Sequence, residues 1–267
     1  MISGRLRLEN LRKICYHEAC IPVQAFFMPN PEKGKHFAMH MRRKPWARPE
    51  LEACPYYREM PENLKGQWRG QFSKEAPLHV ELGCGKGVST AQMTRDNLDV
   101  NYVAVDLVRD VLGSTRRNME AAYGDLPVEN VLITSLHIEY IYKYFSPQDR
   151  VERIYIHFCN PWTKRKKHEK RRLTHSRQLM QYRDFLVDGG EIWFKTDDDQ
   201  LFDDSLGYFE ECGFQVRYLT RDLHQSGFSP NYMSEHEMMY TEKGVPIKFA
   251  IAVKGELKTQ PRLEAED

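Results

Sequence analysis

The chain has 267 residues, with 39 lysine and arginine residues against 38 acids and a formal charge of +1. This length suits one large domain and is short for two typical ones. The small net charge conceals a division, because residues 1–48 hold ten basic residues and three acids and so carry +7, which leaves −6 on the rest. The balanced total therefore does not exclude a polyanionic partner such as a nucleic acid.

The sequence also argues against membrane, metal and disulfide classes. No apolar run approaches the roughly 18 residues that cross a bilayer, and the charged opening MISGRLRLENLRKI lacks a signal-peptide core. The six cysteines, at positions 15, 20, 54, 84, 159 and 212, form neither a CxxC pair nor a Cys/His ligand spacing. We expect a cytoplasmic protein with reduced thiols, no membrane partner and no metal site.

The first part of the chain differs from the rest. Residues 1–77 contain eight prolines, many charges and only weak periodicity, which favours a basic arm laid over a domain. We expect this arm to be partly disordered, and Met41 offers an alternative start that would make residues 1–40 an upstream extension. The last stretch, residues 257–267, is expected to be a disordered tail.

Residues 78–256 show short apolar, β-branched runs separated by stretches of helical length. The expected strands are 78–82, 101–105, 130–134, 153–158, 191–196, 214–219 and 247–253. The expected helices are 88–97, 108–123, 175–187 and 199–212. This alternation predicts one α/β domain with a mostly parallel seven-stranded sheet and helices on both faces. Its ligands should bind beyond the carboxyl ends of the strands, where strand order reverses.

A glycine-rich loop follows the first of these strands. The pattern E-x-G-x-G-x-G runs from Glu81 through Gly83, Gly85 and Gly87 into a predicted helix, so backbone N–H groups can approach a ligand. A dinucleotide fingerprint needs a sixth-position glycine where this chain has Val88, which weakens that interpretation. The spacing resembles instead the first motif of the Rossmann-like S-adenosylmethionine-dependent methyltransferases. A tight turn without a ligand remains the simpler alternative.

A strongly basic segment follows the fourth strand. Seven lysines and arginines fall within the nine residues 164–172, which suits a phosphate backbone better than a small-molecule site. Trp162 and His168 add ring surfaces of the kind that RNA recognition uses. A solvated basic loop is the alternative, but the segment adjoins the carboxyl end of a strand. The RNA-binding candidates are Arg165, Lys166, Lys167, His168, Lys170, Arg171 and Arg172.

Over about residues 41–254 the chain resembles the bacterial tRNA (guanine-N7)-methyltransferases, which modify guanine 46 of the variable loop. The similarity rests on MRRKPWARPE, VELGCGKG, NPWTKRKKHEKRRLT, FKTDDDQLFDDSL and the stretch RDLH to NYMSEHEMMYTEKGVPI. The resemblance implies a class I methyltransferase fold, S-adenosylmethionine as the cofactor and tRNA as the partner. Whether the protein is a monomer or a homodimer is left open.

The resemblance assigns roles by position. Cofactor contacts are expected from Glu81, Gly83, Gly85, Gly87, Asp106 and His137, with Asp106 accepting hydrogen bonds from the ribose hydroxyls. Substrate contacts are expected from Lys164, Asp197, Ser234, Glu235, His236 and Glu237. On sequence grounds alone, Asp197 could instead cap the next helix, His137 could start a helix or lie in the core, and Glu235 and Glu237 would pass for surface charges.

The chain departs from the family pattern at several of these positions. Asn160 stands where the family usually has aspartate, Thr163 stands in place of a proline, and His137 stands in place of an acid. The stretch from Ser234 to Glu237 reads SEHE, where the family has T-x-Y-E. We expect Asn160 to be the catalytic position, with retained binding and a slower chemical step unless Asp197, Glu235 or Glu237 supplies the anion. Two alternatives stay open. One is a tRNA-binding homologue with impaired catalysis, and the other is an amino-methyltransferase that uses Asn160, Pro161 and Trp162 on an exocyclic or amide NH₂ group.

Overall fold

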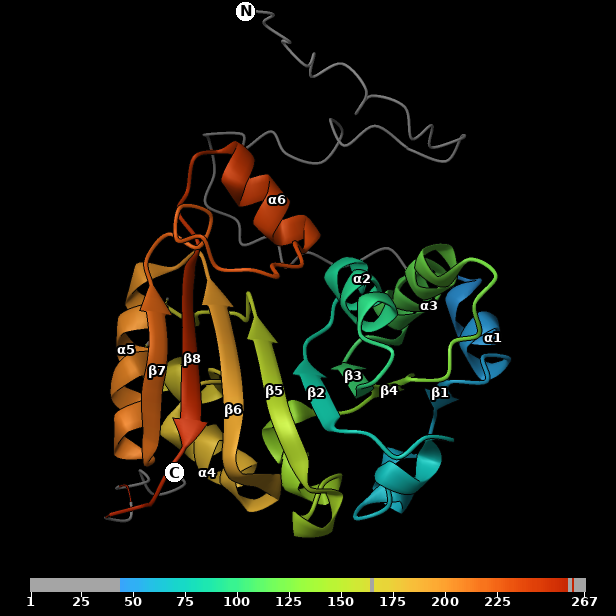
Figure 1. Cartoon of the computed structure of the whole chain (residues 1–267), viewed down its shortest axis with the longest axis horizontal. Helices are drawn as coiled ribbons and strands as arrows, with labels where there is room; N and C mark the ends of the chain where they lie inside the picture. Colours follow the sequence, from blue (N-terminus) through green and yellow to red (C-terminus); the bar gives the residue numbers. More distant parts are fainter. Residues whose placement is uncertain (1–43, 164–165, 259–260, 262–267) are drawn as a thin grey trace, which may run out of the picture. The chain divides into compact units, whose positions relative to one another are not determined.

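A twisted sheet forms the centre of the part of the chain that the structure describes (Figure 1). This computed structural model describes residues 44–163, 166–258 and 261. Within them, eight strands lie in the order β1-β4-β3-β2-β5-β6-β8-β7. The strands are β1 (Tyr57–Arg58), β2 (Leu78–Leu82), β3 (Asn101–Asp106), β4 (Val131–Ser135), β5 (Val151–His157), β6 (Leu186–Thr196), β7 (Phe214–Thr220) and β8 (Lys248–Lys254).

Strand order reverses between β2 and β5. Strands β2, β3 and β4 step in one direction, whereas β5 and β6 step in the other, and every pair from β1 to β6 is parallel. Only β8 runs antiparallel, against both β6 and β7. The carboxyl ends of β2 and β5 therefore border the crevice in which open α/β sheets bind ligands.

The helices cover both faces because each crossover between parallel strands is right-handed. On one side, α2 (Val88–Asp96) and α3 (Arg109–Tyr123) pack beside β3 and β4. On the other, α4 (Ser176–Phe185) and α5 (Asp199–Glu211) pack beside β6 and β7. A further helix, α6 (Glu235–Glu242), lies above the carboxyl ends of β5 and β6 (Figure 1). The predicted Rossmann-like arrangement is confirmed, and α6 was not foreseen.

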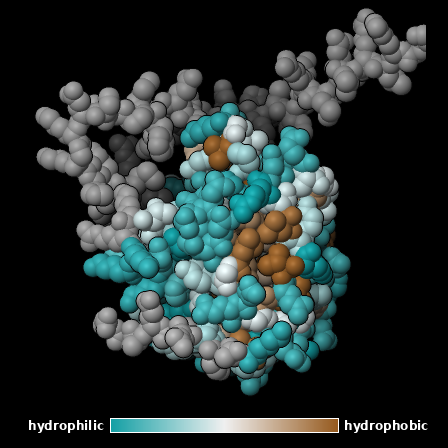
Figure 2. Space-filling model, turned by 90° about the vertical axis from the view of Figure 1, so that its left-hand side faces the viewer, coloured by the Kyte–Doolittle hydropathy of each residue, from teal (hydrophilic) through white to brown (hydrophobic). Residues whose placement is uncertain are grey.

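Strand β7, at one edge of the sheet, exposes Val216 and Leu219, and Figure 2 shows an apolar patch on that side of the molecule. The inner strands β2 and β4 are instead enclosed on both faces. All five residues of β2 are buried, and four of the five residues of β4 are buried as well. These strands belong to one large apolar cluster that also includes Leu179 and Phe185 of α4. A smaller cluster of Leu223, Ile247, Phe249 and Ile251 lies beneath the segment that follows β7. None of the described helices is both long enough and apolar enough to cross a bilayer.

The described part of the predicted arm packs on the same core. Helix α1 (Ala47–Glu52) contacts α3, and the Trp68 ring is fully buried and donates its indole N–H to the Tyr144 carbonyl at 2.8 Å. Strand β1 adds an edge strand to the seven that were expected. We therefore propose that the domain begins near residue 44, upstream of residue 78. The predictions for residues 1–43 and for most of the tail concern residues outside the described ranges.

The remaining short elements are 3₁₀ turns that connect strands and helices. They are η2 (Pro61–Leu64), η3 (Arg69–Gln71), η4 (Ile138–Lys143), η5 (Pro147–Asp149) and η6 (Lys166–Arg171). The last of these carries most of the predicted RNA-binding residues and directly follows the turn at Asn160.

Candidate functional site

The glycine loop between β2 and α2 depends on backbone conformations that L residues rarely adopt. Gly83, Gly85 and Gly87 all have positive φ, at 85°, 57° and 72°. A Cβ built on Gly85 would meet nothing within 4 Å, whereas one built on Gly87 would lie 2.4 Å from Thr115 Cγ2. Gly85 therefore borders open space that a ligand can use, and Gly87 allows the close packing of the loop against α3.

Asp106 closes this loop from the end of β3. Its carboxylate accepts hydrogen bonds from the backbone N–H of Gly85 at 3.1 Å and of Val108 at 2.9 Å. Burial raises the pKa of Asp106 above its ordinary value. The next two residues, Leu107 and Val108, are apolar and exposed, at 52% and 40%. The result is a fixed carboxylate beside an uncovered apolar surface.

Glu81 lies deeper, at the floor of the same crevice. It is 3% exposed, accepts a hydrogen bond from the Thr90 hydroxyl at 2.6 Å, and has His157 Nδ1 at 3.8 Å. Burial is the main cause that raises the pKa of Glu81 to about 7, while the Thr90 hydrogen bond opposes the shift. Sequence reasoning did not identify Thr90 or His157 as partners of Glu81. Nε2 of His157 is buried with no partner among the described residues.

His137 lies on the same rim, beyond the end of β4. It is exposed, precedes η4 and has the ring of Tyr140 at 5.8 Å. A core histidine, one of the possibilities that the sequence left open, is therefore excluded. The structure leaves the expected contact with the cofactor as a proposal.

These residues fit S-adenosylmethionine. Asp106 can offer lone pairs to the ribose hydroxyls, because a carboxylate has about four acceptor positions and the backbone N–H groups that it binds do not fill them all. Leu107 and Val108 present an apolar surface of the kind that a purine covers, and the open side of Gly85 leaves room for close approach. Glu81 can pair with a cationic group. We propose that these groups hold the cofactor.

The turn after β5 places Asn160 at the next position of the rim. Phe158 and Trp162 both have positive φ, at 54° and 51°, and Phe158 N donates to the Lys195 carbonyl at 2.9 Å. The Asn160 Oδ1 atom accepts a hydrogen bond from the Trp162 N–H at 3.0 Å. Asn160 thus stabilises its own turn and can still offer two amide hydrogens and a second lone pair.

The basic segment divides into exposed residues and one buried residue. Lys166, Lys167 and Arg171 are exposed, and the Arg171 guanidinium lies 5.3 Å from the Trp162 ring centroid. His168 and Lys170 are half-buried. Lys164 and Arg165 lie outside the described residues.

Arg172 does not fit the RNA-binding role predicted for it. Its side chain is 1% exposed, its Nη1 pairs with Asp204 Oδ2 at 2.6 Å, and its Nε donates to the Pro161 carbonyl at 2.7 Å. A phosphate cannot reach a guanidinium that is enclosed in this way. Arg172 instead ties the turn at Asn160 to α5.

Asp197 follows β6 on the neighbouring position of the rim. The helix cap that the sequence allowed for Asp197 is made by Asp198, whose carboxylate accepts from the Leu201 N–H at 2.7 Å. Asp197 Oδ1 lies 3.9 Å from His236 Nε2. The His236 ring is half-exposed and contacts Phe158 and Tyr240, with centroid distances of 5.2 and 4.8 Å. Its pKa is lowered by burial.

The other predicted substrate residues lie in α6 or just before it, and they differ in their burial. Glu235 is half-exposed and pairs with Lys86 of the glycine loop at 2.7 Å. Ser234 caps α6 by accepting from the Glu237 N–H at 3.1 Å. Glu237 is fully buried and pairs with Lys195 Nζ at 3.1 Å, so the possibility that it is a surface charge is wrong. Sequence reasoning did not identify Lys195 as its partner.

Comparison with known proteins gives consistent matches. A family model described as "Putative methyltransferase" matches residues 75–250. The tRNA (guanine-N(7)-)-methyltransferase of Clostridium botulinum (strain Eklund 17B / Type B) is 52% identical over 218 residues, which cover 81% of this chain and 99% of that protein. The protein of the same description from Clostridium perfringens (strain 13 / Type A) is 52% identical over 219 residues, covering 81% and 100%.

Among solved structures, the 16S rRNA methyltransferase KamB aligns with a TM-score of 0.48 and 12% identity. The alignment covers 71% of this chain and 92% of that chain. This similarity is too low to add to the topology described above.

Proposed function

The chain belongs to the tRNA (guanine-N7)-methyltransferase family, and we propose that its target is guanine 46 in the variable loop of tRNA. It transfers the methyl group of S-adenosylmethionine to N7 of a guanine in tRNA. A tRNA substrate agrees with the predicted cytoplasmic location. The position within the tRNA is the part of the function that the proposal adds.

One arrangement of turns and basic residues supports a tRNA substrate most directly. The Asn160 turn follows β5, next to β2 and its glycine loop, and the basic residues of η6 come directly after this turn. If a guanine base entered between the two turns, the phosphates of its nucleotide and of the neighbouring nucleotides would lie close to Lys166, Lys167 and Arg171. Cationic side chains at that place can neutralise RNA phosphates, and their contribution depends on salt.

The reaction needs positioning more than proton transfer. When bound, S-adenosylmethionine supplies an electrophilic methyl group on its sulfonium. Guanine N7 carries a free lone pair at neutral pH, so the protein need not remove a proton before attack. What the chain contributes is alignment of the base and stabilisation of the positive charge that develops on the purine.

Asn160 and Asp197 are the groups proposed to hold the base. Asn160 can accept a hydrogen bond from the guanine edge through its second Oδ1 lone pair, and its Nδ2 can donate one. The Asp197 side chain is 23% exposed and lies at the end of the adjacent strand β6. We propose that Asp197 supplies the negative charge that Asn160 lacks, and that His236, whose pKa is lowered by burial, adds a ring surface beside it.

The target position can be mapped on two transcripts of one tRNA, with guanine or adenine at position 46. Each is incubated with the protein and S-adenosylmethionine, then reduced with borohydride and cleaved with aniline at 7-methylguanosine. The proposal predicts cleavage at position 46 of the first transcript and none in the second. Cleavage at another guanine in both transcripts would overturn the position and leave the reaction class intact.

A further inference from the structure

Helix α6 has no fully buried apolar residue, and its apolar contact with the smaller cluster is the partly buried Tyr240 ring. Among its eight residues, all of which the structure describes, Glu237 alone is buried. Surface helices of globular proteins usually pack through a stripe of apolar side chains. Here the residue that is fully enclosed is a carboxylate with an exposed fraction of 0%, so polar contacts make a large part of the attachment of α6.

The buried carboxylate meets a buried ammonium. Lys195, at the end of β6, is 5% exposed, and its Nζ lies 3.1 Å from Glu237 Oε2. The same Nζ donates to the side-chain oxygen of Asn231 and, at 3.2 Å, to the Tyr232 carbonyl. Lys195 therefore holds both α6 and the loop that leads to it.

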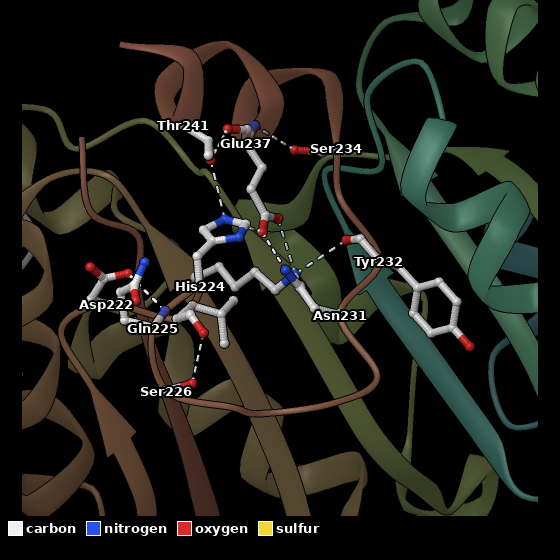
Figure 3. Close-up of polar contacts among 11 residues, drawn as sticks. Asp222, His224, Gln225, Ser226, Asn231, Tyr232, Ser234, Glu237 and Thr241 are labelled. Atoms are coloured by element: carbon white, nitrogen blue, oxygen red, sulfur yellow. Dashed lines mark hydrogen bonds and ion pairs between the residues drawn. The ribbon is translucent and has the colours of Figure 1, made fainter. Parts of the chain in front are cut away.

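Further contacts fix the orientation of the carboxylate. Asn231 Nδ2 donates to Glu237 Oε1 at 2.7 Å, and His224 Nε2 lies 3.2 Å from the same oxygen. Figure 3 shows the Glu237 side chain extending from α6 towards His224 and Asn231. Because hydrogen bonds have preferred directions, this network defines the rotation of α6 more tightly than an apolar contact would.

The rotation of α6 decides where its other face lies. His236 and Tyr240 are four residues apart and so share one side of the helix, adjacent to Glu237. Their rings pack beside each other, with Phe158 next to His236 and Asp197 Oδ1 at 3.9 Å from His236. A turn of the helix that broke the Glu237 contact would separate His236 from Asp197 and open the wall beside Asn160.

We infer that Lys195 is a positioning residue for methyl transfer, acting through Glu237 and Asn231 to hold α6 at the rim where the guanine is bound. The inference rests on the proposed placement of the base beside Asp197 and Asn160. It gives Glu237 a different role from the substrate contact that the sequence predicted, because its two oxygens are occupied within the protein.

The experiment uses four variants of the full chain. Lys195→Met removes the cation, Lys195→Arg retains it, and the double variant Lys195→Met with Glu237→Met replaces both charges by apolar groups. The control is Lys254→Met, since Lys254 is also largely buried and bonded to carbonyls, but near Arg183 and Leu186. Each variant is measured for tRNA kcat and KM, affinity for S-adenosylmethionine, melting temperature, and hydrogen exchange of residues 231–242.

We expect Lys195→Met to lower kcat/KM for tRNA by about 100-fold and the melting temperature by about 10 °C. Exchange of residues 231–242 accelerates. The affinity for the cofactor is compared separately, because the Lys195 charge also acts on Glu81. Lys195→Arg recovers part of the activity. The double variant regains stability because no unpaired charge remains buried, yet stays slow because the directional contact is missing. Lys254→Met keeps the parent kcat/KM.

Two results would overturn the inference. The first is a double variant that recovers the parent kcat/KM, because the pair would then matter for stability alone. The second is a Lys195→Met variant in which residues 231–242 exchange their amide hydrogens at the rate of the parent. This measurement does not require an active enzyme. Absence of methylated tRNA with the parent protein would instead refute the proposed function.

Discussion

Arg172 and Asp204 form an ion pair, with 2.6 Å between Nη1 and Oδ2, in which the Arg172 side chain is enclosed, whereas Lys166, Lys167 and Arg171 of the same basic segment are exposed. Residues of the same basic segment therefore have two different roles. Arg172 fastens the Asn160 turn, whereas Lys166, Lys167 and Arg171 remain available to a polyanion.

The basic loop predicts a salt dependence that Arg172 does not share. Replacing Lys166, Lys167 and Arg171 by alanine should weaken tRNA binding and lower the slope of log K against log salt by roughly 2 to 3. Filter binding between 50 and 250 mM salt would measure it. Parallel lines for the variant and the parent would remove η6 from the RNA surface.

Arg172→Ala should act on stability. It removes the ion pair with Asp204 and the hydrogen bond to the Pro161 carbonyl, while Asp204 stays partly exposed and keeps its bond from Gln200. We therefore expect a loss of about 2 kcal/mol of unfolding free energy. Urea unfolding would show the loss, while the salt slope of tRNA binding, measured on the folded fraction, stays that of the parent. A changed slope with unchanged stability would contradict the structural role.

Two glycines of one loop should respond differently to alanine. Gly87→Ala forces a Cβ against Thr115 at positive φ, and we expect a loss of about 3 kcal/mol in unfolding free energy. Gly85→Ala adds a methyl group to open space, and only about 1 kcal/mol of backbone strain is expected. Its main effect should be weaker binding of S-adenosylmethionine, by calorimetry. Equal affinity in Gly85→Ala and the parent would contradict the assigned cofactor site.

Glu81 predicts a specific dependence of stability on pH. Burial raises its pKa to about 7 from an ordinary value of 4.5, so the folded state binds the proton more tightly than the unfolded state. The stabilisation is complete below about pH 4.5 and is lost as pH rises through 7. The loss amounts to about 3 kcal/mol.

Glu81→Gln removes this titration. Between pH 5 and 8, the unfolding free energy of the parent should therefore fall relative to that of the variant. Saturating S-adenosylmethionine should reduce the fall, because a cationic ligand favours the ionised carboxylate. Urea unfolding at four pH values would test this, and parallel pH curves for the two proteins would contradict it.

Asn160→Asp tests the departure at the catalytic position. Aspartate keeps the acceptor that holds the Trp162 N–H and adds a negative charge beside the base. We expect the single-turnover rate to rise by roughly 3- to 10-fold, with little change in tRNA affinity. Asn160→Ala, which loses the acceptor, should be slower than the parent. A slower aspartate variant would show that the site is adapted to asparagine.

Local pattern was sufficient to predict most of the sheet. Short apolar runs, such as those of β2 and β3, alternate with stretches of helical length. The helix α5 ends just before a glycine, Gly213, and the glycine loop is predicted by three glycines at fixed spacing. Strand β1 has only two residues, too few for any periodicity, so its place at the edge depends on pairing with β4.

The features of the site that the sequence did not predict depend on contacts between distant segments. Lys195 and Glu237 are 42 positions apart, and neither sequence neighbourhood indicates the other residue as its partner. Arg172 belongs to a basic run in which only the fold separates one enclosed guanidinium from its exposed neighbours. Asp197 and Asp198 are adjacent carboxylates, and only the backbone geometry decides that Asp198 caps α5.

Methylation of bulk tRNA that lacks 7-methylguanosine tests the central claim most directly. The protein is incubated with that tRNA and S-adenosylmethionine, and the digested nucleosides are separated by mass spectrometry. The account predicts 7-methylguanosine as the product and no methylated adenosine or N²-methylguanosine. An exocyclic methylamine product, or no product while tRNA still binds, would contradict it.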